Sequence, residues 1–130
     1  MKLFSVPATH IDKAWKDGAF RLGLACQRTK EVTADQLKLM LSRGELQLLG
    51  AMDGDKPKGW AAVRIDQLPN YRALLVYAIH APGAVLLDQL KSYAEHNGCT
   101  AIRGACDDAV SRLWTKYGAQ KRYQIMEFAL

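Results

Sequence analysis

The chain has 130 residues, of which 49% are hydrophobic and 24% charged, and its formal net charge is +5. This composition is typical of a soluble globular protein, and we predict a single domain over residues 1–130 with a sizeable core. No apolar run approaches the length of a membrane span, and the N-terminal residues lack the apolar segment of a secretory signal. We therefore expect a cytoplasmic protein with no membrane partner.

The net charge indicates which partners to expect, and the cysteines indicate whether the chain binds a metal. A net charge of +5 favours acidic partners such as nucleotides or coenzyme phosphates. The basic residues are scattered and accompany no nucleic-acid-binding motif, so we expect no nucleic-acid partner. Cys26, Cys99 and Cys106 are far apart and form no zinc-binding pattern with histidine. They predict buried, reduced thiols and no metal.

The N-terminal third predicts a strand followed by two helical regions. Residues 2–6 read as a short strand, and an apolar pattern with helical spacing follows. Gly18 and Gly23 interrupt this pattern and predict a bent or broken helix. Residues 33–36 (TADQ) are a capping-box pattern, in which Thr33 and the glutamine three positions later bond each other's backbone at the start of the next helix.

The rest of the chain predicts a hairpin and then alternating strands and helices. The predicted strands cover residues 45–52, 60–66, 72–80, 99–106 and 120–130. One helix follows Pro82, and a second helix is capped by Asp107 or Asp108. Residues 72–80 are apolar almost throughout, which suits a central strand covered on both faces. Because strand and helix alternate here, we predict that residues 72–80 and 99–106 are parallel neighbours.

These elements predict an α/β (α+β) fold with a mixed central sheet and the order β-α-α-β-β-β-α-β-α-β. The order resembles the GCN5-related N-acetyltransferase (GNAT) family over nearly the whole chain. The segment GAVLLDQLKSYAEHNGC is similar to that family's coenzyme-binding helix, and DDAVSRLWTKYGAQKRYQIMEFAL is similar to its next helix and last strand. The opening MKLFSVPATHIDKAW resembles small phage-encoded members of the fold, among which are proteins whose genes accompany virion components.

The resemblance implies that acetyl-CoA lies in a split between the two parallel strands. Its pyrophosphate would meet the backbone N–H groups that begin the crossover helix, where the helix dipole favours an anion. The implied coenzyme-binding residues are Ile79, His80, Ala81, Gly83 and Ala84. The family's turn carries Arg or Gln and then two glycines. Here Ala78 and Ala81 replace the Arg/Gln and the first glycine in one register, and His80 and Val85 replace the Arg/Gln and the last glycine in the other.

The catalytic positions are also altered. The family commonly uses a tyrosine on its last helix as general acid, and Trp114 stands at the matching position. An indole N–H is a hydrogen-bond donor but not a usable acid. Two other residues remain candidates: Tyr117, near the same helix face, and His80, which could accept an amine proton because histidine titrates near neutrality. Each of the two also has an ordinary structural interpretation.

Two functions remain open from these residues. The losses at the turn and at Trp114 favour a non-catalytic GNAT-fold protein that binds a protein partner or assembles into a larger structure, such as a bacteriophage virion. Its location would then be the host cytoplasm or the particle. The alternative is an acetyl-CoA-dependent N-acetyltransferase, because this fold can act by positioning its substrates. The tryptophans Trp15, Trp60 and Trp114 are either core residues or anchors for a partner.

Overall fold

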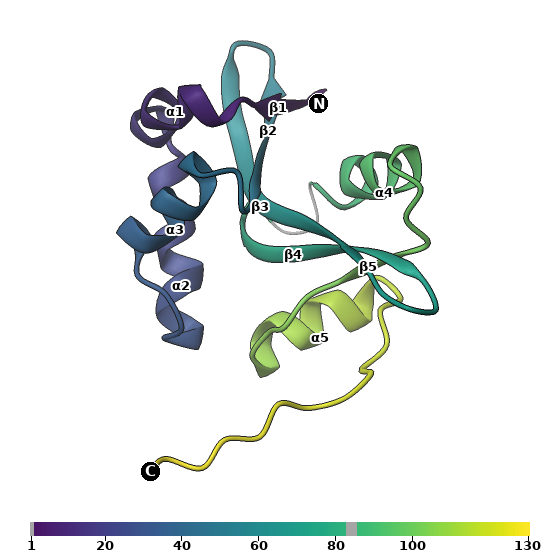
Figure 1. The fold of residues 1–130 in the computed structure, drawn as a ribbon. Helices are drawn as coiled ribbons and strands as arrows, with labels where there is room; N and C mark the ends of the chain where they lie inside the picture. Colours follow the sequence, from purple (N-terminus) through teal and green to yellow (C-terminus); the bar gives the residue numbers. More distant parts are fainter. Residues whose placement is uncertain (1, 83–85) are drawn as a thin grey trace.

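One mixed sheet organises the protein in the computed structural model, which describes residues 2–82 and 86–130 (Figure 1). The strands, in sheet order, are β1 (Lys2–Val6), β2 (Gln47–Asp53), β3 (Lys56–Gln67), β4 (Arg72–His80) and β5 (Ala101–Arg103). The first four are antiparallel neighbours, and β5 runs parallel to β4. The predicted α/β class, the mixed sheet and the parallel pair are therefore confirmed.

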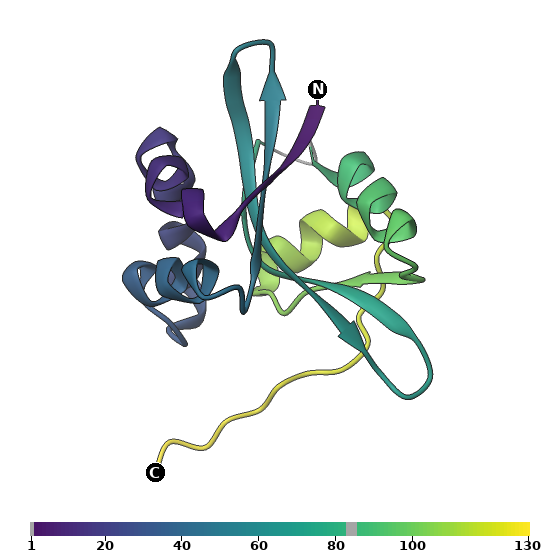
Figure 2. The same cartoon turned by 45° about the horizontal axis from the view of Figure 1, so that its top comes forward.

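Helices cover both faces of the sheet (Figure 2). The α-helices are α1 (Ile11–Asp17), α2 (Gly23–Thr29), α3 (Ala34–Ser42), α4 (Leu87–His96) and α5 (Asp108–Lys116), and two short 3₁₀ turns, η1 (Ala8–His10) and η2 (Ala19–Leu22), flank α1. The first three α-helices lie on one face of the sheet, and α4 and α5 lie on the other. No helix among the described residues is long and apolar enough to cross a membrane.

Each face carries its own apolar core. On the side of α1 to α3, Leu37 and Leu41 pack with Leu48 of β2, and on the side of α4, Leu90 packs with Leu74 of β4. All of these leucines are buried. Burial of both faces explains why β4 is apolar almost throughout, as a strand covered on both faces must be.

Local sequence signals set the helix boundaries on the first face. Gly18 separates α1 from η2 with a φ of 138°, a backbone conformation that side chains disfavour, so the predicted interruption is a true break. The capping box forms as predicted: Gln36 N donates to Thr33 Oγ1 at 3.2 Å, and Thr33 N donates to Gln36 Oε1 at 2.9 Å. Gly18 therefore ends α1, and the capping box begins α3.

The tryptophans belong to the two cores. Trp60 is buried and meets Phe4 edge to face, with ring centroids 5.8 Å apart. Trp15 packs against the first core and Trp114 against the second. One cysteine prediction is wrong: Cys26 and Cys99 are buried, but Cys106 is exposed. Cys106 lies in the loop between β5 and α5.

The predicted last strand is wrong. Residues 119–130, which we call the C-terminal tail, form neither helix nor strand and lead away from the body (Figure 1). The preceding strand is also shorter than expected, since β5 covers only Ala101–Arg103. The physical reason is that a strand exists only through hydrogen bonds to a neighbour, and no described segment runs beside the tail to supply them.

Candidate functional site

The candidate site begins where the two parallel strands separate. They pair at Ala73–Ala101, Leu74–Ile102 and Leu75–Arg103, after which β5 ends and β4 continues to His80. Parallel strands that stop pairing leave unpaired backbone groups between them. This divergence is the split in which the sequence resemblance places acetyl-CoA.

The indole of Trp114 packs at the inner end of this split. A Cβ atom built on Gly104, the residue directly after β5, would lie 3.0 Å from Cη2 of Trp114 and 3.4 Å from the carbonyl oxygen of Val76. Gly104 is therefore a close-approach glycine, whose missing side chain admits the ring edge. Trp114 is half-buried and belongs to the core that β4 and α4 share. It covers the backbone at the first unpaired position of the two strands.

The turn after β4 is described in part. Gly83 and Ala84, two of the implied coenzyme-binding residues, lie outside the described residues. Ile79 and Ala81 are half-buried and pack against the second core. The methyl group of Ala81 faces β3, because a Cβ built on Gly59 would lie 2.8 Å from it. The side chains of Ile79 and Ala81 therefore serve packing in this structure.

His80 lies between two surface cavities. The larger, of about 780 Å³, lies between α2, α3 and the end of β4. It is lined by Phe20, Arg21, Gly23, Leu24, Cys26, Gln27, Lys30, Glu31, Val32, Thr33, Ala34, Gln36 and His80. The smaller, of about 250 Å³, adjoins Arg21, Lys58 and Trp60 and is also lined by His80. Tyr117 lines neither of them and is exposed at the end of α5, so the structure does not bring the two candidate catalytic residues into one cavity.

The charged residues of the larger cavity were missed by sequence reasoning. Arg21 lies in the 3₁₀ turn that follows the helix break, and Lys30 and Glu31 lie in the loop between α2 and α3. Only the fold brings these segments to the end of β4. A usable signal was the helix break itself, because Gly18, with a φ of 138°, turns the chain directly before the segment that carries Arg21.

The cavity offers limited chemistry. Burial raises the pKa of the Cys26 thiol, so this group stays protonated at neutral pH and is a poor nucleophile. Among the described residues, no group of three or more His, Cys, Asp and Glu side chains lies close enough to hold a metal ion. His80 and Glu31 remain as the cavity's proton acceptors.

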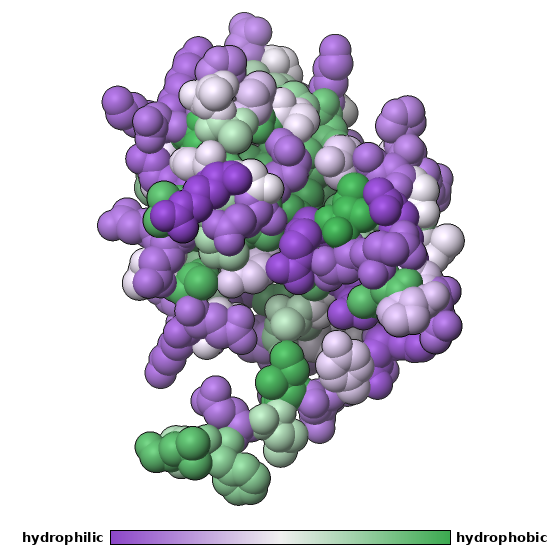
Figure 3. All heavy atoms as spheres, in the orientation of Figure 1, coloured by the Kyte–Doolittle hydropathy of each residue, from purple (hydrophilic) through white to green (hydrophobic). Residues whose placement is uncertain are grey.

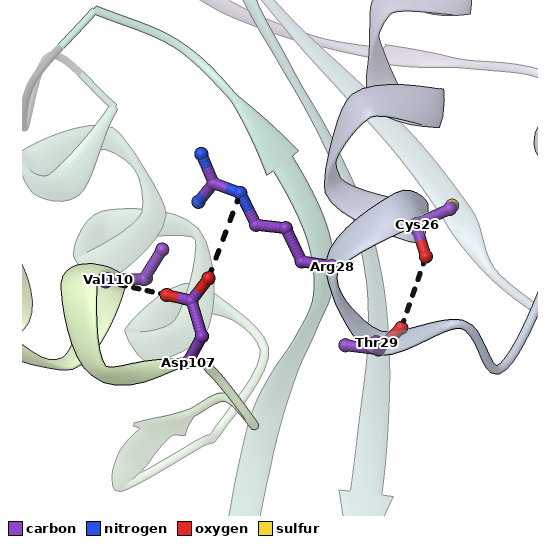
Figure 4. A network of polar contacts seen from close by, with 5 residues as sticks. All are labelled: Cys26, Arg28, Thr29, Asp107 and Val110. Carbon is purple, nitrogen blue, oxygen red and sulfur yellow. Dashed lines mark hydrogen bonds and ion pairs between the residues drawn. The ribbon is translucent and has the colours of Figure 1, made fainter.

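An ion pair joins the two faces of the sheet near the split. Nε of Arg28 on α2 lies 3.9 Å from Oδ2 of Asp107, which precedes α5 (Figure 4). The other carboxylate oxygen of Asp107 accepts from Val110 N at 2.9 Å and caps α5. Both charged side chains are about half exposed, so the ion pair adds little stability. Its effect is to link α2 and α5 beyond the end of β5.

Trp114 lies at the split in which the sequence resemblance places the thioester arm of acetyl-CoA. The edge of its ring approaches Gly104 directly after β5, and the carbonyl oxygen of Val76 is close to the same glycine. Such an arm could enter only if the ring left the core against which it packs. That movement would expose apolar surface to water, at a free-energy cost.

Comparison with solved structures shows which fold this is. A ribosomal-protein-alanine N-acetyltransferase from Brucella melitensis biovar Abortus 2308 superposes with a TM-score of 0.73 at 14% sequence identity, over 100% of each chain. An aminoglycoside acetyltransferase from an uncultured soil metagenomic sample, solved with sisomicin, gives 0.68 at 13% identity, over 99% of this chain and 94% of that one. A probable acetyltransferase gives 0.67 at 14%, over 100% and 97%.

The sequence matches no protein-family model and no curated protein. The structural likeness therefore shows the fold alone. The chain has the fold of the GNAT acetyltransferases, as its sequence resemblance predicted.

Proposed function

We propose that this chain is a binding or assembly protein built on the acetyltransferase fold, and that it does not transfer acetyl groups. The proposal rests on the position of Trp114. The residue stands where the family resemblance expects an acidic tyrosine, and its ring packs on Gly104 at the inner end of the split. An indole N–H cannot protonate a leaving thiolate. The same side chain thus removes the acid and fills the space for the thioester.

The proposed partner is a protein, and the proposed assembly is a bacteriophage particle. The resemblance of the opening residues to phage-encoded members of the fold supports this part of the proposal. The tagged chain, produced in its native host, should then sediment with a particle far larger than its own 14.5 kDa. Recovery of the free chain alone would contradict the assembly.

A second candidate function is an acetyl-CoA-dependent N-acetyltransferase, and the larger cavity favours it. An amine bound there would meet the carboxylate of Glu31 and the imidazole of His80, which both line it. The first could hold an ammonium ion, and the second could take its proton.

Thermal unfolding with acetyl-CoA decides between the two candidates. A ligand at a hundred times its Kd stabilises the native state by about 2.7 kcal/mol, which for a domain of this size raises Tm by several degrees. We expect no shift at millimolar acetyl-CoA, with an active N-acetyltransferase as positive control in the same experiment. A saturable rise that CoA reproduces, together with thiol release when amines are added, would overturn the proposal and establish the enzyme.

A further inference from the structure

The smaller of the two cavities beside His80 has a lining of one charge sign. Hydrophilic side chains cover much of the body on the face shown in Figure 3, so polarity alone indicates no site on this protein. The smaller cavity differs because Arg21, Lys58 and His80 surround the indole of Trp60 there. Among the described residues that line it, none is acidic. We call it the cationic cavity.

A buried hydrogen-bond donor opens into this cavity. Trp60 is only 3% exposed, and within the described part of the chain no group accepts a hydrogen bond from its indole N–H. The one enclosed side-chain atom without a partner in that part is Oε1 of Gln89, so the N–H of Trp60 is reached from the cavity that it lines. Because buried polar groups normally have a hydrogen-bond partner, this donor is available to a ligand.

Arg21 brings further donors to the same place. Its Nη1 and Nε1 of Trp60 each lie 3.1 Å from the position that a Cβ atom on Gly18 would occupy. The guanidinium lies over the ring of Phe20, with its central carbon 5.3 Å from the ring centroid. This contact positions the group without using its N–H donors. Neither Arg21 nor Lys58 forms an ion pair with any described carboxylate, so both charges remain available.

The lining of the cationic cavity selects an anion. Guanidinium, ammonium and indole groups donate hydrogen bonds and accept none, and a neutral imidazole can donate one. An amine would meet two positive charges, whereas an oxyanion would receive charge-assisted hydrogen bonds. The cavity volume of about 250 Å³ is below the range of about 300–1,000 Å³ for pockets that enclose drug-sized ligands, so it suits one small charged group. A phosphoryl group fits best, since its three terminal oxygens are strong acceptors.

The cationic cavity lies across the sheet from the place where the sequence resemblance puts the coenzyme phosphates. Trp60 belongs to the core on the side of α1 to α3. The adjacent Gly59 faces Leu86, which precedes α4 and belongs to the other core. Successive residues of a strand point to opposite faces of its sheet. An anion beside the indole of Trp60 would therefore occupy a different site from a pyrophosphate at the start of α4.

We infer that the cationic cavity binds the phosphoryl group of a small molecule, either inorganic phosphate or a phosphate monoester. Arg21 and Lys58 balance its charge, and the N–H groups of Trp60 and His80 donate to its oxygens. The larger cavity shares Arg21 and His80 with the cationic cavity and is also lined by the exposed ring of Phe20, so it has room for the apolar part of a monoester. The site requires neither a protein partner nor acetyl-CoA, so it holds or fails separately from the proposed function.

Nuclear magnetic resonance of the indole N–H groups tests this inference on the full chain. Trp15→Phe, Trp60→Phe and Trp114→Phe assign the three indole signals, and any two of these variants suffice. We expect inorganic phosphate, titrated at constant ionic strength, to shift the Trp60 signal saturably in the millimolar range while the other two signals stay in place. Phenyl phosphate is the second probe. Tighter binding of phenyl phosphate would support a monoester as the ligand, and equal affinity would support free phosphate.

Variants at two lysines of one strand separate the site from a general effect of charge. Arg21→Gln and Lys58→Gln should each weaken phosphate binding by about fivefold or more. Lys56→Gln is the matched control, because it removes the same charge from an exposed position of β3 that does not line the cavity, and it should change the affinity by less than about twofold. Equal effects of Lys56→Gln and Lys58→Gln would overturn the inference. The absence of a saturable shift at Trp60, or a shift at Trp114 in its place, would overturn it as well.

Discussion

A double-mutant cycle on Gly104 and Trp114 tests the packing on which the proposed function depends. In Gly104→Ala the new Cβ would lie 3.0 Å from Cη2 of the indole, well inside ordinary carbon contact of about 3.5–4.0 Å. The edge of the half-buried ring must move by a few tenths of an ångström, and we place the cost near the lower end of the range of about 1–3 kcal/mol for overpacking. Gly104 has no positive φ, so the backbone itself accepts alanine.

Removing the ring first should abolish this cost. Trp114→Ala alone should destabilise by about 2–3 kcal/mol, below the range for a fully buried tryptophan because the side chain is half-buried. In that background only the carbonyl oxygen of Val76, at 3.4 Å, is close to the new methyl group. Alanine also restricts the unfolded chain, which stabilises by about 0.4–1 kcal/mol. We therefore expect Gly104→Ala to be near neutral there, with a coupling energy of about 1–2 kcal/mol.

Urea unfolding followed by circular dichroism measures the four free energies without relying on tryptophan fluorescence. Leu113→Ala is the matched control on the same helix, because its side chain is partly exposed, and it should couple to Gly104→Ala by less than about 0.5 kcal/mol. An equal cost of Gly104→Ala with and without Trp114 would refute the placement of the ring. The proposed loss of the coenzyme site would then have no structural support.

Two further predictions concern charged groups. Asp107→Ala should lower the free energy of unfolding in urea by about 1 kcal/mol, because it removes the cap on Val110 N. Arg28→Ala should change that free energy by less than half as much, since its ion pair with Asp107 is exposed. Equal effects of the two substitutions would show that the cap is not the main contribution of Asp107. The hydrogen bond from Lys38 and its positive charge lower the pKa of Asp12 in the folded state. The ionised Asp12 therefore stabilises the fold fully above the pKa of the unfolded chain, about 4, and this contribution is lost as the pH falls through the lower pKa of the folded state. Asp12→Asn should therefore flatten the acid-side fall in unfolding free energy, and an unchanged pH profile would contradict this role.

The elements that the sequence determined are those whose signals act over a few residues. Thr33 and Gln36 cap α3 through contacts three positions apart, so the pattern alone predicted them. Gly18 breaks the first helix because its own backbone takes a φ of 138°. The apolar run from Arg72 to His80 predicted a central strand, since only burial on both faces suits such a run.

The candidate site depended on contacts that no local pattern contains. His80 was predicted, but its cavity joins Arg21, Lys30 and Glu31 only after α2 and α3 dock beside β4. The sequence marked Trp114 as a changed position, whereas its packing on Gly104 follows from where β4 and β5 stop pairing. Such contacts between distant segments are set by the register of the sheet, which is a property of the whole fold.

The C-terminal tail also shows the difference between what a local sequence pattern predicts and what the tertiary structure decides. Its residues have the pattern of a strand, and the sequence predicted one over positions 120–130, but a strand is defined by its neighbour. The tertiary structure leaves Ile125, Met126 and Phe128 in solvent and β5 with an open edge. By itself the sequence therefore determined that this segment favours an extended, covered conformation. Only the tertiary structure decided that no described strand pairs with the tail, because hydrogen bonding and burial require a neighbour in space.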